Sequence, residues 1–181
     1  MFDPKAEPQA GETIAVMKTN HGEMKFRLFS EKVPTGVKNF VALAEEGKYT
    51  DVPFHRVIEN FMIQGGDFTN KNGTGGHSSE GPGSTIGDEY DADLTHIRGA
   101  LSYAKTAMPN SIGSQFFVVH PEGGTHFLDH PQGGGPAEGY TVFGQLYSGF
   151  ETLDAIATTA TDGQDCPREA CVIESVEIAT A

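Results

Sequence analysis

The sequence predicts a mostly β fold, in which short antiparallel strands close into a barrel and two α-helices cap its open ends. Three observations support this class: runs of alternating apolar and polar residues recur along the chain, segments rich in glycine, proline and aspartate separate them, and two helical patterns stand isolated among the strands. The 181 residues, 37% of them hydrophobic, suffice for one core. We therefore expect one domain over residues 13–181, preceded by a polar, flexible leader at residues 1–12.

A hairpin and a helix open the predicted domain. The hairpin strands are Ile14–Thr19 and Glu23–Phe29, and the second alternates apolar with charged residues as a half-buried strand does. A helix is predicted over Pro34–Glu46, because proline suits a first turn, apolar residues follow at helical spacing, and Gly47 is placed to end it. These elements supply the first strands and the first cap of the barrel.

The rest of the chain divides into one long loop, one helix and several strands. Asn70–Asp93 is dense in glycine, serine, proline and aspartate, so we expect a surface excursion there. The second helix is predicted over Phe150–Ala157, where apolar residues share one face. Further strands are predicted at Ile97–Tyr103, Gln115–Val119, Thr141–Tyr147 and Val172–Ile178.

The charge balance is strongly acidic and limits the possible partners. The chain has 25 acidic and 12 basic residues, for a net charge of −13. Nucleic acids and anionic membranes require basic patches, so we expect neither as a partner. No apolar run approaches the ~18 residues that span a bilayer, and no signal sequence opens the chain, which favours a cytoplasmic monomer. The acidic residues are spread along the chain. They either keep the protein soluble or, as we favour, adapt it to a salt-rich cytoplasm, where ions screen the repulsion among them.

Three polar side chains stand inside otherwise apolar strand sequence: Arg56, Gln64 and Gln115. A polar group on a packed strand surface must find a hydrogen-bond partner or incur a cost of about 1–3 kcal/mol. By strand alternation, Met62 shares a face with Gln64, and Phe117 shares a face with Gln115. Two strands thus each offer a glutamine beside a large apolar group, with an arginine nearby. This combination suits a ligand that is a neutral, partly apolar amide.

Other site classes find little support in the sequence. His120, His126 and His130 are spaced for a loop, without an H-E-x-x-H motif or a cysteine partner, so we expect no metal. Cys166 and Cys171 fit no zinc pattern; reduced thiols are the expected state, and a local disulfide stays open. No glycine run fits a dinucleotide or Walker motif, and no G-x-S-x-G motif is present. We therefore expect no cofactor and no serine hydrolase.

Two long runs closely resemble the signature blocks of the cyclophilins, which are peptidyl-prolyl cis/trans isomerases. They are F-H-R-V-I-E-N-F-M-I-Q-G-G-D-F at Phe54–Phe68 and G-S-Q-F-F-V-V at Gly113–Val119. The resemblance is closest to the bacterial or archaeal branch and covers roughly Thr13–Ala179. It implies a closed eight-stranded antiparallel β-barrel capped by two α-helices, and an isomerase that assists protein folding. Shorter matches are N-G-T-G-G at 72–76, R-G-A-L-S-Y-A at 98–104, F-L-D at 127–129 and V-F-G at 142–144.

The resemblance also implies a site for the X-Pro bond. Rotation about this bond needs no nucleophile; it needs a grip on the proline and a donor to the twisted amide nitrogen, a role that suits the permanently charged Arg56. By resemblance, the catalytic residues are Arg56, Gln64 and Phe61. The same resemblance places the substrate-binding residues at Met62, Lys105, Gln115, Phe117, Phe127, Leu128 and Tyr140, with the main chain of Lys105 binding the residue before proline.

Two positions depart from the best-known eukaryotic pattern. Phe127 stands where that pattern has tryptophan, and Tyr140 where it has histidine. Because the tryptophan offers a ring N–H to cyclosporin, we expect this drug to bind weakly. Between Asp129 and Tyr140 lies a glycine- and proline-rich loop that either selects substrates or acts as an unstructured spacer.

Two function hypotheses follow from the residues and the resemblance. The first is a cofactor-independent isomerase acting on X-Pro bonds in unfolded or flexible protein segments. The alternative is a proline-segment binding module or holdase chaperone that uses the same pocket without needing turnover. Arg56 favours the isomerase, since a module that only binds does not need a donor to the twisted amide.

Overall fold

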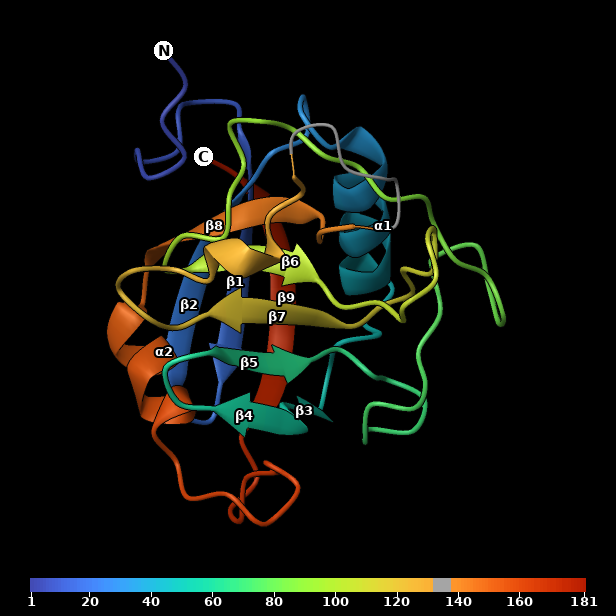
Figure 1. Cartoon of the computed structure of the whole chain (residues 1–181), viewed down its shortest axis with the longest axis vertical. Helices are drawn as coiled ribbons and strands as arrows, with labels where there is room; N and C mark the ends of the chain where they lie inside the picture. Colours follow the sequence, from blue (N-terminus) through green and yellow to red (C-terminus); the bar gives the residue numbers. More distant parts are fainter. Residues whose placement is uncertain (132–137) are drawn as a thin grey trace.

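The fold is a strongly curled antiparallel sheet with two α-helices (Figure 1). This computed structural model describes residues 1–131 and 138–181, so the predicted loop between Asp129 and Tyr140 lies largely outside the described residues. The helices of the described chain are α1 (Pro34–Glu45), α2 (Phe150–Ala157) and a short 3-10 helix, η1 (His126–Leu128). The strands are β1 (Thr13–Thr19), β2 (Gly22–Leu28), β3 (Val52–Pro53), β4 (Arg56–Ile58), β5 (Met62–Gly65), β6 (Ala100–Tyr103), β7 (Phe116–Val119), β8 (Val142–Ser148) and β9 (Val172–Thr180).

The strand order within the sheet is β3-β9-β1-β2-β8-β6-β7-β5-β4, and every neighbouring pair is antiparallel. In Figure 1, β4, β5 and β7 cross in front of β1, β2 and β9, because the sheet curls back on itself. The helices α1 and α2 lie at different sides of this curled sheet. The predicted class, mostly β and antiparallel with two helices, is therefore confirmed.

The closure of the barrel differs in detail from the prediction. The described residues form nine strands rather than eight, and the sheet ends at β3 and β4. No ladder joins these two strands within the described chain; Phe54 and His55 connect them covalently. The reason is local: β3 has only two residues, and one of them, Pro53, has no N–H to donate to a ladder. The covalent chain, rather than a hydrogen-bonded ladder, therefore connects the two end strands of the sheet.

The predicted helices and strands agree closely with the structure. Helix α2 has the predicted bounds, and α1 begins at Pro34 as predicted but ends one residue earlier than predicted, at Glu45. The ends of the predicted strands differ by at most three residues. Phe40 of α1 packs against Phe116 and Phe143, with ring centroids 5.7 and 5.2 Å apart. These contacts anchor the helix on the aromatic core inside the sheet.

Residues 1–12 contain no helix or strand and pack against β2. The reason is Arg27, only 4% exposed, whose guanidinium donates to the main-chain oxygens of Asp3 and Ala6 at 2.9 and 3.0 Å. The same guanidinium binds both carboxylate oxygens of Glu12, at 3.0 and 2.9 Å. Beside the Arg27–Glu12 ion pair, the backbone N–H of Gly11 donates to the main-chain oxygen of Ala181. The main-chain oxygen of Glu12 accepts the N–H of Ala181. The predicted flexibility of residues 1–12 stays a prediction.

The predicted surface excursion at Asn70–Asp93 is loop, apart from an isolated bridge at Ile86. Its first part is organised by the fully buried carboxylate of Asp67. That carboxylate accepts hydrogen bonds of 2.9–3.2 Å from backbone N–H groups of the glycine-rich segment that follows it, at Thr69, Asn70, Asn72, Gly73 and Gly75. Burial raises the pKa of this carboxyl, but these donors outweigh burial and lower the pKa to about 2.

The helices of the described residues include none that is both long and apolar enough to cross a membrane.

The Asp67 contacts predict a loss of stability at acidic pH. The pKa in the folded state, about 2, lies below the ordinary value of 3.8, so the stabilisation is complete above 3.8 and is lost as pH falls through 2. We expect Asp67→Asn to lower the free energy of unfolding by about 2 kcal/mol at pH 7 and to flatten this part of the pH dependence. Urea denaturation followed by circular dichroism at pH 7, 5 and 3 measures both effects.

The matched control is Asp51→Asn, an exposed aspartate in a left-handed turn conformation that asparagine also tolerates. Equal losses of stability in the two variants would show that the Asp67 contacts are not the cause of the predicted loss of stability at acidic pH.

Candidate active site

The pairing of three strands brings two predicted catalytic side chains and one predicted substrate-binding side chain into one row. Arg56 of β4 lies opposite Gln64 of β5, and Gln64 lies opposite Phe117 of β7. Directly paired residues share a face of the sheet, so these three side chains stand side by side on it. The intervening residues Ile63 and Val118 are fully buried in the core on the other face. The predicted alternation is thus correct, and the row is a property of the strand register.

A cavity of about 190 Å³ lies along this row. Apolar side chains form its floor: Met62 and Phe117 are buried, and Tyr140 closes one side with its ring edge-on to Phe117 at 5.8 Å. The cavity brings together eight of the ten predicted site residues and adds Ala104. The full lining is Arg56, Phe61, Met62, Gln64, Ala104, Lys105, Phe117, Leu128 and Tyr140.

Phe127 and Gln115, the remaining predicted residues, lie beside this cavity rather than in it. Phe127 is 77% exposed, and its ring centroid is 5.8 Å from that of Phe61, so it forms an apolar rim outside the opening. The short helix η1, which the sequence analysis did not predict, turns Leu128 inward and leaves Phe127 outside. Gln115 lines a neighbouring cavity instead.

Arg56 is exposed at the edge of the apolar cavity. Within the described part of the chain, the ion pairs and hydrogen bonds include no partner for its guanidinium. A guanidinium stays charged at any physiological pH and offers several N–H donors in a fixed plane. Arg56 therefore presents a permanent cation and free donors to whatever enters the cavity.

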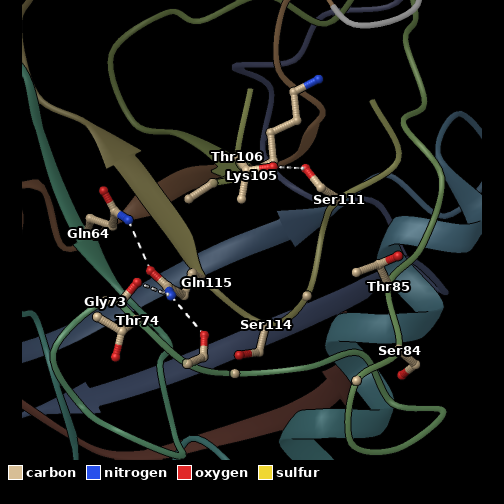
Figure 2. Close-up of a pocket in the computed structure, with 15 residues that line it drawn as sticks. Gln64, Gly73, Thr74, Ser84, Thr85, Lys105, Thr106, Ser111, Ser114 and Gln115 are labelled. Carbon is tan, nitrogen blue, oxygen red and sulfur yellow. Dashed lines mark hydrogen bonds between the residues drawn. The ribbon is translucent and has the colours of Figure 1, made fainter. Parts of the chain in front are cut away.

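A network of amides connects Gln64 to the glycine-rich loop (Figure 2). Gln64 Nε2 donates to Gln115 Oε1 at 3.1 Å, and Gln115 Nε2 donates to the main-chain oxygens of Gly73 and Gly75 at 2.8 and 2.9 Å. These bonds hold both amides in one orientation. They also border a second, polar cavity of about 350 Å³ that shares Gln64, Ala104 and Lys105 with the first. Because they share lining residues, the two cavities are neighbours.

Lys105 contributes to both cavities while its charge is bound elsewhere. In Figure 2 its side chain points away from Gln115. Its Nζ lies 3.2 Å from Asp88 Oδ2, and both side chains are only 3% exposed. Asp88 Oδ2 also accepts the backbone N–H of Asn110 at 2.9 Å. This buried ion pair connects the surface excursion to Lys105 at the edge of the site. The sequence analysis did not identify Asp88.

Behind the apolar floor lies a Ser–His–Asp group that the sequence analysis also missed. The ring of His96 stacks on Phe117 at 5.8 Å, with Nδ1 at 2.7 Å from Asp129 and Nε2 at 2.9 Å from Ser102. Ser102 is fully buried, and its Oγ lies 3.1 Å from the main-chain oxygen of Thr141, so no substrate carbonyl can reach it. Burial raises the pKa of the Asp129 carboxyl, but hydrogen bonds with His96 and His126 outweigh burial. The pKa of this carboxyl therefore lies below its ordinary value. The group supports Phe117 from behind.

The three histidines weighed as metal ligands have different partners. His120 bonds Asn60 and Asp154, His126 bonds Asp129, and the ring of His130 stacks on Tyr90 at 3.9 Å. Across residues 1–131 and 138–181, no group of three or more histidine, cysteine, aspartate or glutamate side chains is arranged to hold a metal ion. Cys166 and Cys171 are free thiols.

The arrangement therefore suits non-covalent chemistry on an amide. A small apolar cavity can hold a ring or short side chain, Gln64 can bond a main-chain group, and Arg56 can donate to an atom that gains electron density. No serine, cysteine or histidine is among the residues that line the 190 Å³ cavity in the described chain. Such a site can stabilise a distorted amide without attacking it.

Known proteins are similar to this chain in sequence and in fold. Residues 14–178 match the family described as cyclophilin type peptidyl-prolyl cis-trans isomerase/CLD. A Staphylococcus aureus (strain USA300) protein that carries the name of a peptidyl-prolyl cis-trans isomerase is 39% identical over 198 residues, which cover 95% of this chain and 94% of that protein. A Streptococcus pyogenes protein, named as a bifunctional phosphatase/peptidyl-prolyl cis-trans isomerase, is also 39% identical; the match spans 95% of this chain but only 40% of that longer protein.

Solved structures agree with these relatives. A crystal structure of a cyclophilin type peptidyl-prolyl cis-trans isomerase from Cryptosporidium parvum superposes with a TM-score of 0.82 at 34% identity, covering 94% of this chain and 99% of that one. A second crystal structure of the same protein, obtained in the presence of the dipeptide Ala-Pro, also gives 0.82 at 35% identity, covering 93% and 99% of the two chains. By sequence, fold and the composition of its pocket, this chain belongs to the cyclophilin-type peptidyl-prolyl cis-trans isomerases.

Proposed function

We propose that this isomerase acts on X-Pro bonds in unfolded or flexible protein segments, with the proline ring held in the 190 Å³ cavity. The observation that carries this proposal is the position of Arg56. Its guanidinium stands at the edge of an apolar cavity, directly across the sheet from Gln64, and the described residues give it no partner. The Ala-Pro dipeptide present with a similar crystal structure supports a proline-containing ligand.

The chemistry follows from the electronic structure of the amide. Rotation about the C–N bond faces a barrier of about 18–20 kcal/mol, because the bond is partly double. In the twisted transition state the nitrogen lone pair is no longer delocalised, so the nitrogen becomes a better hydrogen-bond acceptor. Arg56 donates to this nitrogen and stabilises the transition state more than either planar isomer. The side chains of Phe61, Met62, Phe117 and Leu128 hold the ring by apolar contact while the bond rotates.

The polar residues orient the segment around the proline. Gln64, fixed by Gln115, bonds the main chain of the bound segment. The main chain of Lys105 binds the residue before proline, because the ammonium of Lys105 is engaged with Asp88. Gln115 holds the wall between the two cavities. These contacts fix the chain on one side of the rotating bond, so that the other side can turn.

The alternative function is a holdase that binds proline-containing segments without essential turnover. The exposed apolar side chains of Phe127 and Met108, which are 77% and 66% exposed, favour it, because they offer binding surface beyond the ring pocket. Arg56 distinguishes the two functions, since a binding module has no need of a donor to the twisted amide.

We also propose a setting for the protein: a monomer in a salt-rich cytoplasm, with residues 13–181 acting as one domain. The net charge of −13 supports a halophilic origin, because mobile ions screen the self-repulsion of such a surface. Cofactors, nucleic acids and membranes have no part in the proposed activity.

Substitution of Arg56 tests the catalytic proposal. We expect Arg56→Ala to lower kcat about 100-fold with a much smaller change in KM, since the donor acts mainly in the transition state. NMR exchange between the cis and trans signals of a short X-Pro peptide measures the rate. Arg168→Ala, at an arginine that bonds Thr161 in a separate loop, is the control and should keep full activity. Acceleration by Arg56→Ala equal to that by the wild type would remove Arg56 as the donor, and no acceleration by a folded wild type that binds the peptide would favour the holdase.

Cyclosporin affinity tests the role of Phe127. We expect weak binding by the wild type and about fivefold tighter binding by Phe127→Trp, because the indole N–H adds one hydrogen bond to the drug. Isothermal titration calorimetry measures both, and Phe127→Leu controls for the size of the apolar rim. Tight binding by the wild type, unaffected by Phe127→Trp, would remove this residue from the drug contact.

Thermal melting in salt tests the halophilic proposal. Molar KCl should raise Tm by several degrees relative to dilute buffer, because screening weakens repulsion among the acidic side chains. Differential scanning calorimetry at constant pH measures the shift. A Tm that is indifferent to KCl would leave solubility as the role of the acidic surface.

A further inference from the structure

The pocket depends on a tight turn that carries Phe61 between β4 and β5. Asn60, at the centre of the turn, adopts a left-handed conformation with φ of 62°. The backbone N–H of Phe61 bonds Ile58 O at 3.1 Å, and Phe61 O accepts the N–H of His120 at 3.0 Å. Asparagine adopts this conformation more readily than most residues other than glycine. The turn also receives support from outside β4 and β5.

His120 supplies that support through its ring. The ring is buried, with the residue 7% exposed, and its Nδ1 accepts the backbone N–H of Asn60 at 2.9 Å. Its Nε2 lies 3.0 Å from Asp154 Oδ1 in α2. A backbone N–H can only donate and a carboxylate can only accept, so the ring is the neutral tautomer with its proton on Nε2. In this form His120 connects α2 to the Phe61 turn.

Charged groups of both signs surround His120. Asp154 favours a positive ring, but Arg98 binds both oxygens of Asp154 at 2.9 Å and donates to His120 O at 2.6 Å. Glu122 pairs with Arg98 at 3.2 Å and is 90% exposed, and Glu59 in the turn itself is exposed. The Asp154 carboxylate therefore binds the permanently charged Arg98 as well as the ring of His120.

We propose that His120 is a positioning residue that holds the Phe61 turn against the pocket when neutral and releases it when protonated. Protonation places a second N–H on Nδ1, facing the N–H of Asn60, so their hydrogen bond is lost. The bond from Nε2 to Asp154 is kept, which leaves α2 in place while the turn loosens. Histidine is the side chain whose ordinary charge change falls between pH 5 and 8, so the isomerase senses mildly acidic conditions through this contact.

The effect falls on substrate binding rather than on rotation. This step rests on the proposed function, in which Phe61 contacts the proline ring. Phe61 grips the ring equally in the planar and twisted states, whereas the Arg56 donor lies on β4 and does not depend on the turn. Loss of a uniform contact raises KM and leaves kcat nearly unchanged. We expect KM to rise about fivefold between pH 8 and pH 5, the size of one lost hydrogen bond.

Two variants separate protonation from mere removal of the ring. His120→Asn places Oδ1 near the position of Nδ1, so it can accept the Asn60 N–H but cannot titrate; its KM should stay low and flat from pH 8 to 5. His120→Phe fills the site without an acceptor, so its KM should be high at every pH. His21→Asn, in the β1–β2 turn, is the matched control and should follow the wild type.

The measurements are KM and kcat by NMR exchange on an X-Pro peptide from pH 5 to 8, and the chemical shift of the Asn60 amide in wild type without substrate. A rise in KM that is absent in His120→Asn, with an Asn60 amide that titrates together with the His120 ring, would support the proposal. The same pH dependence in wild type and His120→Asn, or an Asn60 amide that does not titrate with the ring, would overturn it. If the wild type lacks activity at every pH, the proposed function fails, and the Asn60 titration still decides the histidine contact independently.

Discussion

The register of β5 between β4 and β7 is the constraint on which the pocket depends. It aligns Arg56, Gln64 and Phe117 in one row, and it is held by the burial of Ile63 and Val118 on the opposite face. A slip of one residue would exchange the two faces, placing a glutamine in the core and an isoleucine in the pocket. The cost of burying an amide without partners makes that slip unfavourable, so the same packing that stabilises the sheet also orders the site.

Much of this arrangement could be predicted because it is local. Alternation along β5 and β7 places Met62 beside Gln64 and orients Phe117, and the helical spacing of apolar residues gives α2 its bounds. The cavity itself could not be derived from periodicity, because its lining comes from segments as distant as Phe61 and Tyr140. Their meeting was anticipated only through the resemblance to a known family.

The supporting contacts escaped prediction for a physical reason. Asp129 reaches His96 across 33 positions of sequence, and Asp88 reaches Lys105 through a loop without any repeating pattern. Such polar pairs depend on the path of irregular loops, which composition does not specify. The same holds for the ends of the sheet: a two-residue strand that includes Pro53 is too short to give a periodic signal.

The junction of the chain ends has a consequence for modularity. Gly11 and Glu12 bond the main chain of Ala181, so the domain is entered and left at one point of its surface, away from β4 and β5 (Figure 1). A fold with paired entry and exit can be joined to other proteins, or have its ends relocated, without distortion of its interior. The Streptococcus pyogenes relative, in which the matching region forms 40% of a bifunctional protein, is consistent with such portability. The meeting of the two chain ends thus makes this isomerase a unit that evolution, or an engineer, can attach elsewhere intact.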